Sequence, residues 1–399
     1  MEVKQIYELV NNATQETLGK EALVAEDLSN LVDIGTQIMN ANSVDKYVRS
    51  LVDHIGKVIF VNRTYNGVAP SVLRDGWEYG AVLEKITAQL PQATENESWE
   101  LEDGTSYDPN IFYKPQVSAK FFNKRTTWEI PLSFTEMQAR GSFSSASQMN
   151  GFLSMLYTSV ENAKSIKTSD MIMRTINNMI GETFYNLSSA GTYTSGNNRC
   201  VNLWQLFQTA YPNSTLTLSE APTAPEFIRY SAYIMSLYEA RLQKMSTLFN
   251  IGGQPRFTPK DRLHTILLAE FANAADVFLQ SEAWHNEFTR LPKAEIVPFW
   301  QGSGTDYAYA TAGSSGSPNV GTSAICVKPS STPSATVNPM GILGVMFDRD
   351  ALGVCNENQR VTTNYNPKAE FFTNWYKVDT GYFNDLNENF VVFYAAATS

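Results

Sequence analysis

The spacing of apolar residues predicts one dominant helix, from Ser144 to about Tyr185. This stretch contains no proline. Ser144 can cap its first turn, because a serine oxygen accepts hydrogen bonds from the free amide groups there. A continuous helix of this length spans ~60 Å, about twice the length of an ordinary helix in a globular domain. Its first half carries apolar residues at steps of three and four, which form one stripe: Met149, Phe152, Leu153, Leu156, Val160 and Ala163.

The second half of this helix presents a different apolar face. After the polar stretch 165–170, the apolar set turns by roughly half a circle at about 100° per residue. The two halves are therefore expected to contact different neighbours, and the polar stretch is a place for a bend. The second set consists of Ile172, Ile176, Met179 and Ile180, and Met171 and Met173 beside them are expected to fill gaps in a core.

The residues before this helix divide into an arm and a polar ribbon. Residues 1–56 carry two helical patterns, whereas residues 57–134 alternate like strands and turns. Within that region, 91–115 has too few apolar residues to bury itself in the core of its own chain. The pattern predicts a two-stranded excursion with a polar tip. An isolated ribbon of this kind is marginal alone and needs a neighbour.

The residues after the long helix mix helices and strands. The spacing predicts a helix over Glu226–Phe249, a buried strand over Arg262–Leu268 and a helix from Phe271 to Gln280. Glycine, serine and proline make 302–339 a surface loop. The last sixty residues return to strands, which gives an α+β fold: Ile342–Phe347, one or two aromatic strands within Phe371–Tyr382, and Asn389–Tyr394.

Composition excludes several classes of protein. The chain has 399 residues, of which 43% are hydrophobic, so it can bury a core. Its 40 acids outnumber its 30 bases, and a net charge of −10 opposes a sequence-independent grip on nucleic acid. The N-terminus lacks a secretory pattern, and no apolar run reaches membrane-spanning length. Three widely separated cysteines make a disulfide framework improbable and suit a reducing cytoplasm.

Candidate chemistry is sparse, and no cofactor, metal or catalytic residue is expected. His54, His264 and His285 are scattered, whereas a zinc site needs closely converging ligands. Asp348 and Asp350 flank Arg349 after a strand. A carbohydrate hydrolase with a paired-acid mechanism, or a sugar-binding protein, is one interpretation of these acids and the nearby aromatic residues. A turn with a local salt bridge, beside a core or interface of aromatic residues, is favoured.

Several segments together resemble the major capsid proteins of tailed bacteriophages, which have the Hong Kong 97-type fold. These segments are Ser50–Gly56 before the ribbon, the strand and helix from Thr265 to Gln280, Gly344–Ala351 and Asn364–Pro367. The resemblance extends over nearly the whole chain. It implies an N-terminal arm at 1–56, an extended β-hairpin loop (E-loop) with its base strands at 57–134, a peripheral domain at 135–194 and 341–399 with the spine helix at 144–185, and an axial domain at 195–340.

The resemblance also implies a function. A subunit of this family is a structural protein, not an enzyme, and self-assembles as hexamers and pentamers into a head shell. The shell encloses double-stranded DNA without sequence-specific binding, forms in the host bacterial cytoplasm and has no membrane partner. Because only about 56 residues precede the ribbon, a separate scaffolding protein is expected besides a portal. No cross-linking role is assigned to the ribbon lysines.

A polar ribbon laid across an adjacent subunit exchanges its exposed edge groups for intersubunit bonds. We expect its aromatic residues to make that contact: Trp77, Tyr79, Trp99, Tyr107, Phe112, Tyr113, Phe121 and Phe122. An encapsulin-type nanocompartment, which packages cargo protein, is an alternative with the same fold.

Overall fold

The chain is described by a computed structural model. The described residues are 3–18, 72–74, 83–91, 93–135, 146–187, 196–280, 291–298, 300, 325, 327–329 and 334–397. These residues form both helices and strands, so the predicted α+β class is confirmed. The helical patterns expected between residues 19 and 56, and most of the loop expected at 302–339, lie outside these ranges. A helix at the start of the arm, α1 (Val3–Leu18), was not predicted.

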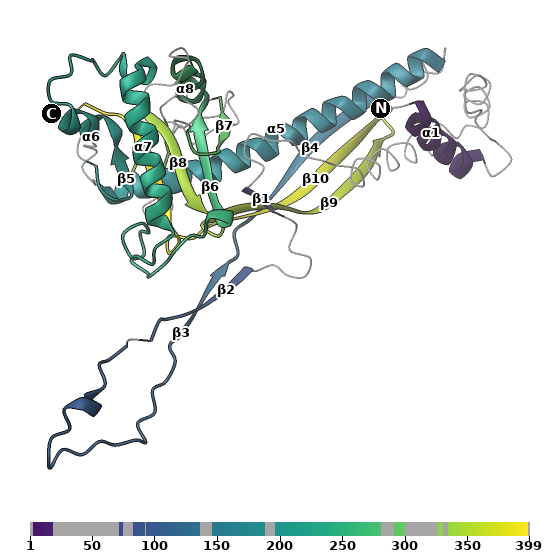
Figure 1. Cartoon of the computed structure of the whole chain (residues 1–399). Coiled ribbons are helices and arrows are strands. Elements are labelled where there is room, and N and C mark those ends of the chain that lie inside the picture. The colour runs from purple at the N-terminus through teal and green to yellow at the C-terminus, as the bar shows by residue number, and fades with distance from the viewer. Residues whose placement is uncertain are drawn as a thin grey trace.

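The dominant element is the predicted long helix, α5 (Ala146–Leu187), with 42 residues. Figure 1 shows it crossing the body and continuing beside the long strands. The helix is continuous through 165–170, where a bend was expected. Tertiary contacts hold this polar region: Asn356 Nδ2 donates to Thr168 Oγ1 at 3.3 Å, and Lys164 Nζ lies 6.0 Å from the Tyr376 ring centroid.

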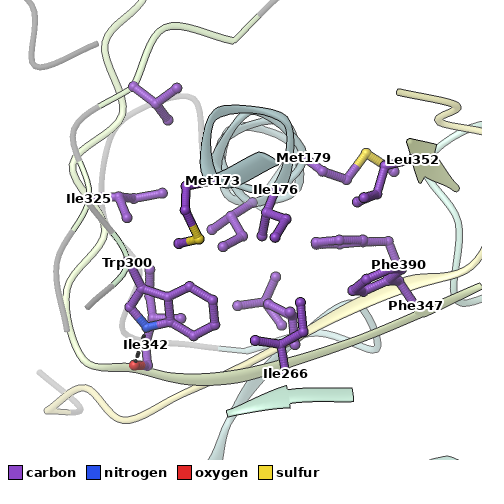
Figure 2. Packing of buried hydrophobic residues seen from close by; sticks show 14 of the residues in the cluster. Met173, Ile176, Met179, Ile266, Trp300, Ile325, Ile342, Phe347, Leu352 and Phe390 are labelled. Atoms are coloured by element: carbon purple, nitrogen blue, oxygen red, sulfur yellow. Dashed lines mark hydrogen bonds between the residues drawn. The ribbon is translucent and has the colours of Figure 1, made fainter. Parts of the chain in front are cut away.

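The second half of α5 packs on a five-stranded sheet. The strand order is β5 (Cys200–Asn202), β11 (Phe390–Tyr394), β8 (Ile342–Asp348), β6 (Leu263–Leu268) and β7 (Glu295–Val297). Figure 2 shows Met173 and Ile176 pointing from α5 toward Trp300 and Ile266, while Met179 points toward Leu352. The methionines are therefore core residues, as predicted. Trp300 is tied in place because its Nε1 donates to the Ile342 carbonyl at 2.9 Å.

Side-chain alternation gives the same sheet a second buried face. Ile266 and Leu268 face the α5 side, whereas Leu267 between them faces the other side. That other face is covered by α6 (Leu203–Ala210), α7 (Pro225–Leu242) and α8 (Ala269–Gln280). Both faces of these strands are buried, which explains their continuous apolar runs. The predicted unit of a buried strand followed by a helix is confirmed as β6 and α8.

The helix expected over Glu226–Phe249 ends seven residues early, at Leu242. The chain then turns back on itself, since Ser246 and Arg256 form an isolated bridge. Phe249 fits the apolar spacing of the helix in the sequence, but it lies in this turn. From there it reaches the core and packs on Tyr238, with 5.9 Å between the ring centroids. The helix ends where the Leu242 carbonyl accepts a hydrogen bond from Thr258 N at 2.8 Å, on the returning part of the chain, in place of the next helical turn.

A four-stranded sheet lies along α5, in the order β1 (Leu73–Arg74), β9 (Leu352–Asn366), β10 (Phe371–Asn384) and β4 (Arg125–Thr135). The aromatic region is one strand, β10, whose residues alternate between buried and half-buried. Phe372 and Tyr376 are fully buried, so they are core residues. Residues 341–399 supply strands to both sheets.

The remaining elements are β2 (Leu83–Ala88), β3 (Val117–Phe122) and the short 3-10 helices η2 (Glu97–Trp99), η3 (Ala221–Thr223) and η4 (Lys260–Arg262).

Candidate intersubunit ribbon and its anchor

Residues 83–122, called the ribbon here, project away from the body (Figure 1). β2 and β3 pair antiparallel from Leu83 opposite Phe122 to Ala88 opposite Val117. One further bond follows, from Gln89 N to Gln116 O at 2.9 Å. The predicted two-stranded excursion is thus confirmed at its base.

The outer part of the ribbon, residues 91–115, is not two-stranded as expected, since η2 is its one regular element among the described residues. Side chains satisfy backbone amides locally there. Asn96 Oδ1 accepts from Ser98 N, and Asp108 Oδ1 accepts from Asn110 N, both at 2.8 Å. Turns of this kind compete with the strand ladder.

The ribbon carries large aromatic side chains that its own chain leaves uncovered. Trp99 is 95% exposed, Phe112 84% and Tyr113 82%. Tyr107 and Phe121, from the same predicted set, are also exposed. Large apolar side chains left exposed along one segment are typical of a site that contacts a partner. Burying one such side chain stabilises by roughly 1.5–3 kcal/mol.

Phe122 differs from the rest of the predicted contact set. It is buried, and its ring centroid lies 5.2 Å from that of Phe383 in the body. Adjacent residues of a strand point to opposite faces, so Phe121 faces solvent while Phe122 packs on its own chain. Trp77 and Tyr79 lie outside the described residues. The prediction missed exposed aliphatic residues of the ribbon, among them Ile86, Leu101 and Ile111.

Five charged side chains, called the anchor here, fix the base of the ribbon to the body. Lys85 and Lys120 are directly opposite in the strand register. Both ammonium groups lie 2.8 Å from carboxylate oxygens of Asp385, whose side chain is only 2% exposed. Lys85 also contacts Glu388 at 2.5 Å, and Arg256 Nε donates to Glu388 at 3.1 Å. One carboxylate therefore holds both strands of the ribbon.

Burial and ion pairing shift the pKa of the Asp385 carboxyl group in opposite directions. Burial by itself raises the pKa of Asp385. The bonds from Lys120 and Lys85, together with the backbone amide of Asn387, outweigh burial, so the pKa lies below its ordinary value. Asp385 is consequently ionised at neutral pH. Sequence reasoning missed the anchor, because its lysines and carboxylates lie about 300 and 265 positions apart and share no local pattern.

The acids considered for catalysis form a structural turn. Asp348 is buried, and its Oδ1 accepts from the backbone N of Asp350 at 2.8 Å. Asp350 forms a salt bridge with Arg262 from η4. The expected turn is confirmed, but the bridging partner is Arg262, and Arg349 contributes its backbone amide, which donates to the Arg262 carbonyl at 2.9 Å.

Within the described ranges, no group of three or more histidine, cysteine or acidic side chains is arranged to hold a metal ion. His264 lies against Phe347 at 5.8 Å between ring centroids. The thiols of Cys200 and Cys355 are buried, and burial raises the pKa of Cys200 strongly. None of the helices searched has the length and apolar content that a bilayer crossing needs.

Solved structures similar to this chain come from bacteriophages. The capsid structure of Staphylococcus phage Andhra aligns at 12% identity over 82% of this chain and 83% of that chain, with a TM-score of 0.47. A structure of the head fiber and inner core protein gp22 of bacteriophage P68 aligns at 9% identity over 84% and 86%, with a TM-score of 0.49. The capsid structure of cyanophage P-SCSP1u aligns at 10% identity over 84% and 89%, with a TM-score of 0.40. These alignments are too loose to carry an assignment.

A family model carries the assignment. No curated protein matches the chain. The model described as Phi29-like phage major capsid protein matches residues 8–394, which is nearly the whole sequence. The chain therefore belongs to the Phi29-like phage major capsid proteins, and it is a shell-forming structural subunit of a virion rather than an enzyme.

Proposed function

We propose that each subunit lays its ribbon across an adjoining copy and that this contact joins subunits into hexamers and pentamers of a phage head shell. The supporting observation is the exposure of Trp99, Phe112 and Tyr113 on a segment that leaves the body. A projecting ribbon and the surface that receives it are different patches of the same molecule. Contacts of that type are head-to-tail, and they close into rings when the rotation permits.

The proposed domains follow from the two sheets. The arm comprises residues 1–56, and the extended loop (E-loop) with its base strands comprises 57–134, a range that includes the ribbon. The peripheral domain is built on α5 and the four-stranded sheet, from 135–194 and 341–399. The axial domain, 195–340, carries the helices on the far face of the five-stranded sheet. β8 and β11, which lie within 341–399, also pair in that sheet and so join the two domains.

We further propose the partners of the shell. It encloses double-stranded DNA without sequence-specific contacts, which suits a chain with net charge −10. A separate scaffolding protein and a portal take part in assembly, which occurs in the host bacterial cytoplasm. Neither an encapsulin nor a carbohydrate hydrolase is supported, because the family match is to phage capsids and Asp348 and Asp350 form a structural turn.

The test replaces the exposed aromatic residues. We expect Trp99→Ala/Phe112→Ala/Tyr113→Ala to fold normally, because these side chains make little contact with their own chain, but to lose assembly at least tenfold. The measurement is the sedimenting fraction of the purified full-length chain, with negative-stain imaging. The matched control replaces three exposed polar ribbon residues, as Thr94→Ala/Ser106→Ala/Gln116→Ala. If the aromatic variant assembles like the control, or the unaltered chain never assembles, the proposal fails.

A further inference from the structure

The outer ribbon is strongly acidic as well as aromatic. Residues 91–115, called the acidic tip here, contain six acids and one base, a net charge of −5. Glu95, Glu100, Glu102 and Asp103 are exposed, and none has an ion-pair partner among the residues that the structure describes. The same 25 residues carry the exposed Trp99, Phe112 and Tyr113. A partner surface for the tip must therefore offer both apolar contact and positive charge.

One described segment of the body has the opposite charge. Residues 241–262, called the basic segment here, connect the last turn of α7 to η4 and contain five bases and one acid. Arg256, Lys260 and Arg262 form ion pairs with carboxylates of the same chain, so the bases that remain for a partner are Arg241 and Lys244. Lys244 is exposed and has no ion-pair partner within the described part of the chain. Arg241 is exposed beside it and stacks its guanidinium on Tyr238 at 5.4 Å from the ring centroid.

The same segment also exposes apolar side chains. Met245 is 43% exposed, Leu248 52% and Phe257 49%. Two backbone hydrogen bonds between Ser246 and Arg256, at 2.9 and 3.0 Å, bring the two arms of the segment together. Apolar side chains bordered by basic ones are the arrangement that interfaces use, with an apolar centre and a charged rim.

The basic segment lies beside the base of the ribbon in its own chain. Arg256 of the segment contacts Glu388, which also contacts Lys85 of the ribbon. Figure 1 shows the outer ribbon leading away from the body, so the tip does not cover the segment of its own chain. Because the tip leaves its own body and the segment is exposed, the tip can reach the segment of another copy.

We infer that the acidic tip of one subunit docks on the basic segment of the adjoining copy. This inference rests on the proposed function and names the receiving surface. The tip's aromatic side chains pack on Met245, Leu248 and Phe257, while its carboxylates face Arg241 and Lys244. The charges set the position and the partner, and the apolar contact supplies most of the binding energy.

Charge reversal tests the contact. The tip-reversed chain carries Glu95→Lys/Glu100→Lys/Glu102→Lys, and the segment-reversed chain carries Arg241→Glu/Lys244→Glu. Each chain alone places like charges together, so we expect its sedimenting fraction to fall at least tenfold, with an unchanged thermal melt. The control Lys293→Glu/Lys368→Glu makes the same change in net charge as the segment reversal, at exposed sites elsewhere, and it should assemble like the unaltered chain.

Mixing the two reversed chains in equal amounts distinguishes contacts between copies from contacts within one chain. In a ring of alternating chains every tip faces a segment of opposite charge, so assembly should return in the mixture. Pentamers cannot alternate, and the restored material should contain rings of six, sheets or tubes. Restoration only when both reversals are in one chain would show an intramolecular contact and overturn the inference.

Two other results also overturn the inference. One is a segment-reversed chain that assembles like the unaltered protein. The other is a segment-reversed chain that assembles normally but loses bound DNA, which would make the basic segment a nucleic-acid contact. The proposed function is judged separately: it survives either result if the variant without Trp99, Phe112 and Tyr113 still fails to assemble.

Discussion

At the residue scale, the anchor shows how few side chains orient the ribbon. Asp385 is nearly inaccessible to solvent and receives both Lys85 and Lys120. A buried carboxylate without partners is costly, whereas a paired one is tolerated. Because the two lysines face each other across β2 and β3, one pairing fixes the direction in which both strands leave the body.

The anchor should be sensitive to acid. The pKa of Asp385 is lower in the folded chain than its unfolded value of about 3.9, so its pairing contributes stability above that pH and loses it as the pH falls through the folded pKa. We expect Asp385→Asn to lower the free energy of unfolding by about 2–4 kcal/mol at pH 7, and this loss should shrink once the pH falls below about 3.9.

Thermal unfolding of both chains between pH 7 and pH 3 measures this effect. The control is Asp103→Asn, which changes an exposed carboxylate with no ion-pair partner among the described residues. It should alter stability by less than about 0.5 kcal/mol at every pH. A difference for Asp385→Asn that stays constant down to pH 3 would show that ionic pairing is not its cause.

Gly341 is required where β8 begins beside the end of β11. Its φ is +73°, and a Cβ there would lie 2.0 Å from the Ala395 carbonyl oxygen. We expect Gly341→Ala to destabilise the chain by at least about 2 kcal/mol, measured by urea unfolding, since both the dihedral and the space oppose a side chain. Gly253→Ala is the control: its φ is +63° but nothing lies within 4 Å, so the loss should be only about 1 kcal/mol.

At the element scale, α5 owes its position to the face that it buries. Its Ile172, Ile176, Met179 and Ile180 are all buried, which confirms the second predicted stripe. Of the first stripe, Val160 is buried, whereas the side chains at 146–159 lie outside the description. Helices in proteins gain most of their stability from such packing.

Substitution of two isoleucines on α5 distinguishes the effect of packing on stability from the effect of helix propensity. Ile176 is fully buried in the cluster of Figure 2, so we expect Ile176→Ala to cost about 2–5 kcal/mol. Ile166 lies on the same helix but is 60% exposed, and Ile166→Ala should change stability by less than about 0.5 kcal/mol. Urea unfolding measures both. Equal losses would mean that α5 does not pack on the sheet as described.

At the scale of the whole molecule, the subunit combines a body, whose five-stranded sheet is buried on both faces, with an outer ribbon that has no core of its own. Its five-stranded sheet is covered on both sides, whereas the acidic tip has little secondary structure and large exposed aromatic residues. A segment of this kind gains order only from a partner.

Amide hydrogen exchange should reveal this difference. In the monomer, amides of residues 91–115 should exchange rapidly and those of β8 and β11 slowly, since most tip amides lack backbone hydrogen bonds. On assembly we expect exchange in the tip to slow by at least tenfold, while exchange in the sheet stays unchanged. Tip amides that are already protected in the monomer, or that stay unprotected in assembled material, would contradict this expectation.

The sequence by itself determined the α+β class, the long helix, the buried strands and the ribbon that its own core does not bury. Each of these follows from the periodicity of neighbouring residues, such as Ile172 and Ile176 on one helical face. Tertiary structure alone decided that α7 stops at Leu242, that Phe122 is buried while Phe121 is not, and that Lys85 meets Asp385. These outcomes depend on contacts between distant segments, and no local pattern records which distant group will supply a charge or cover a ring.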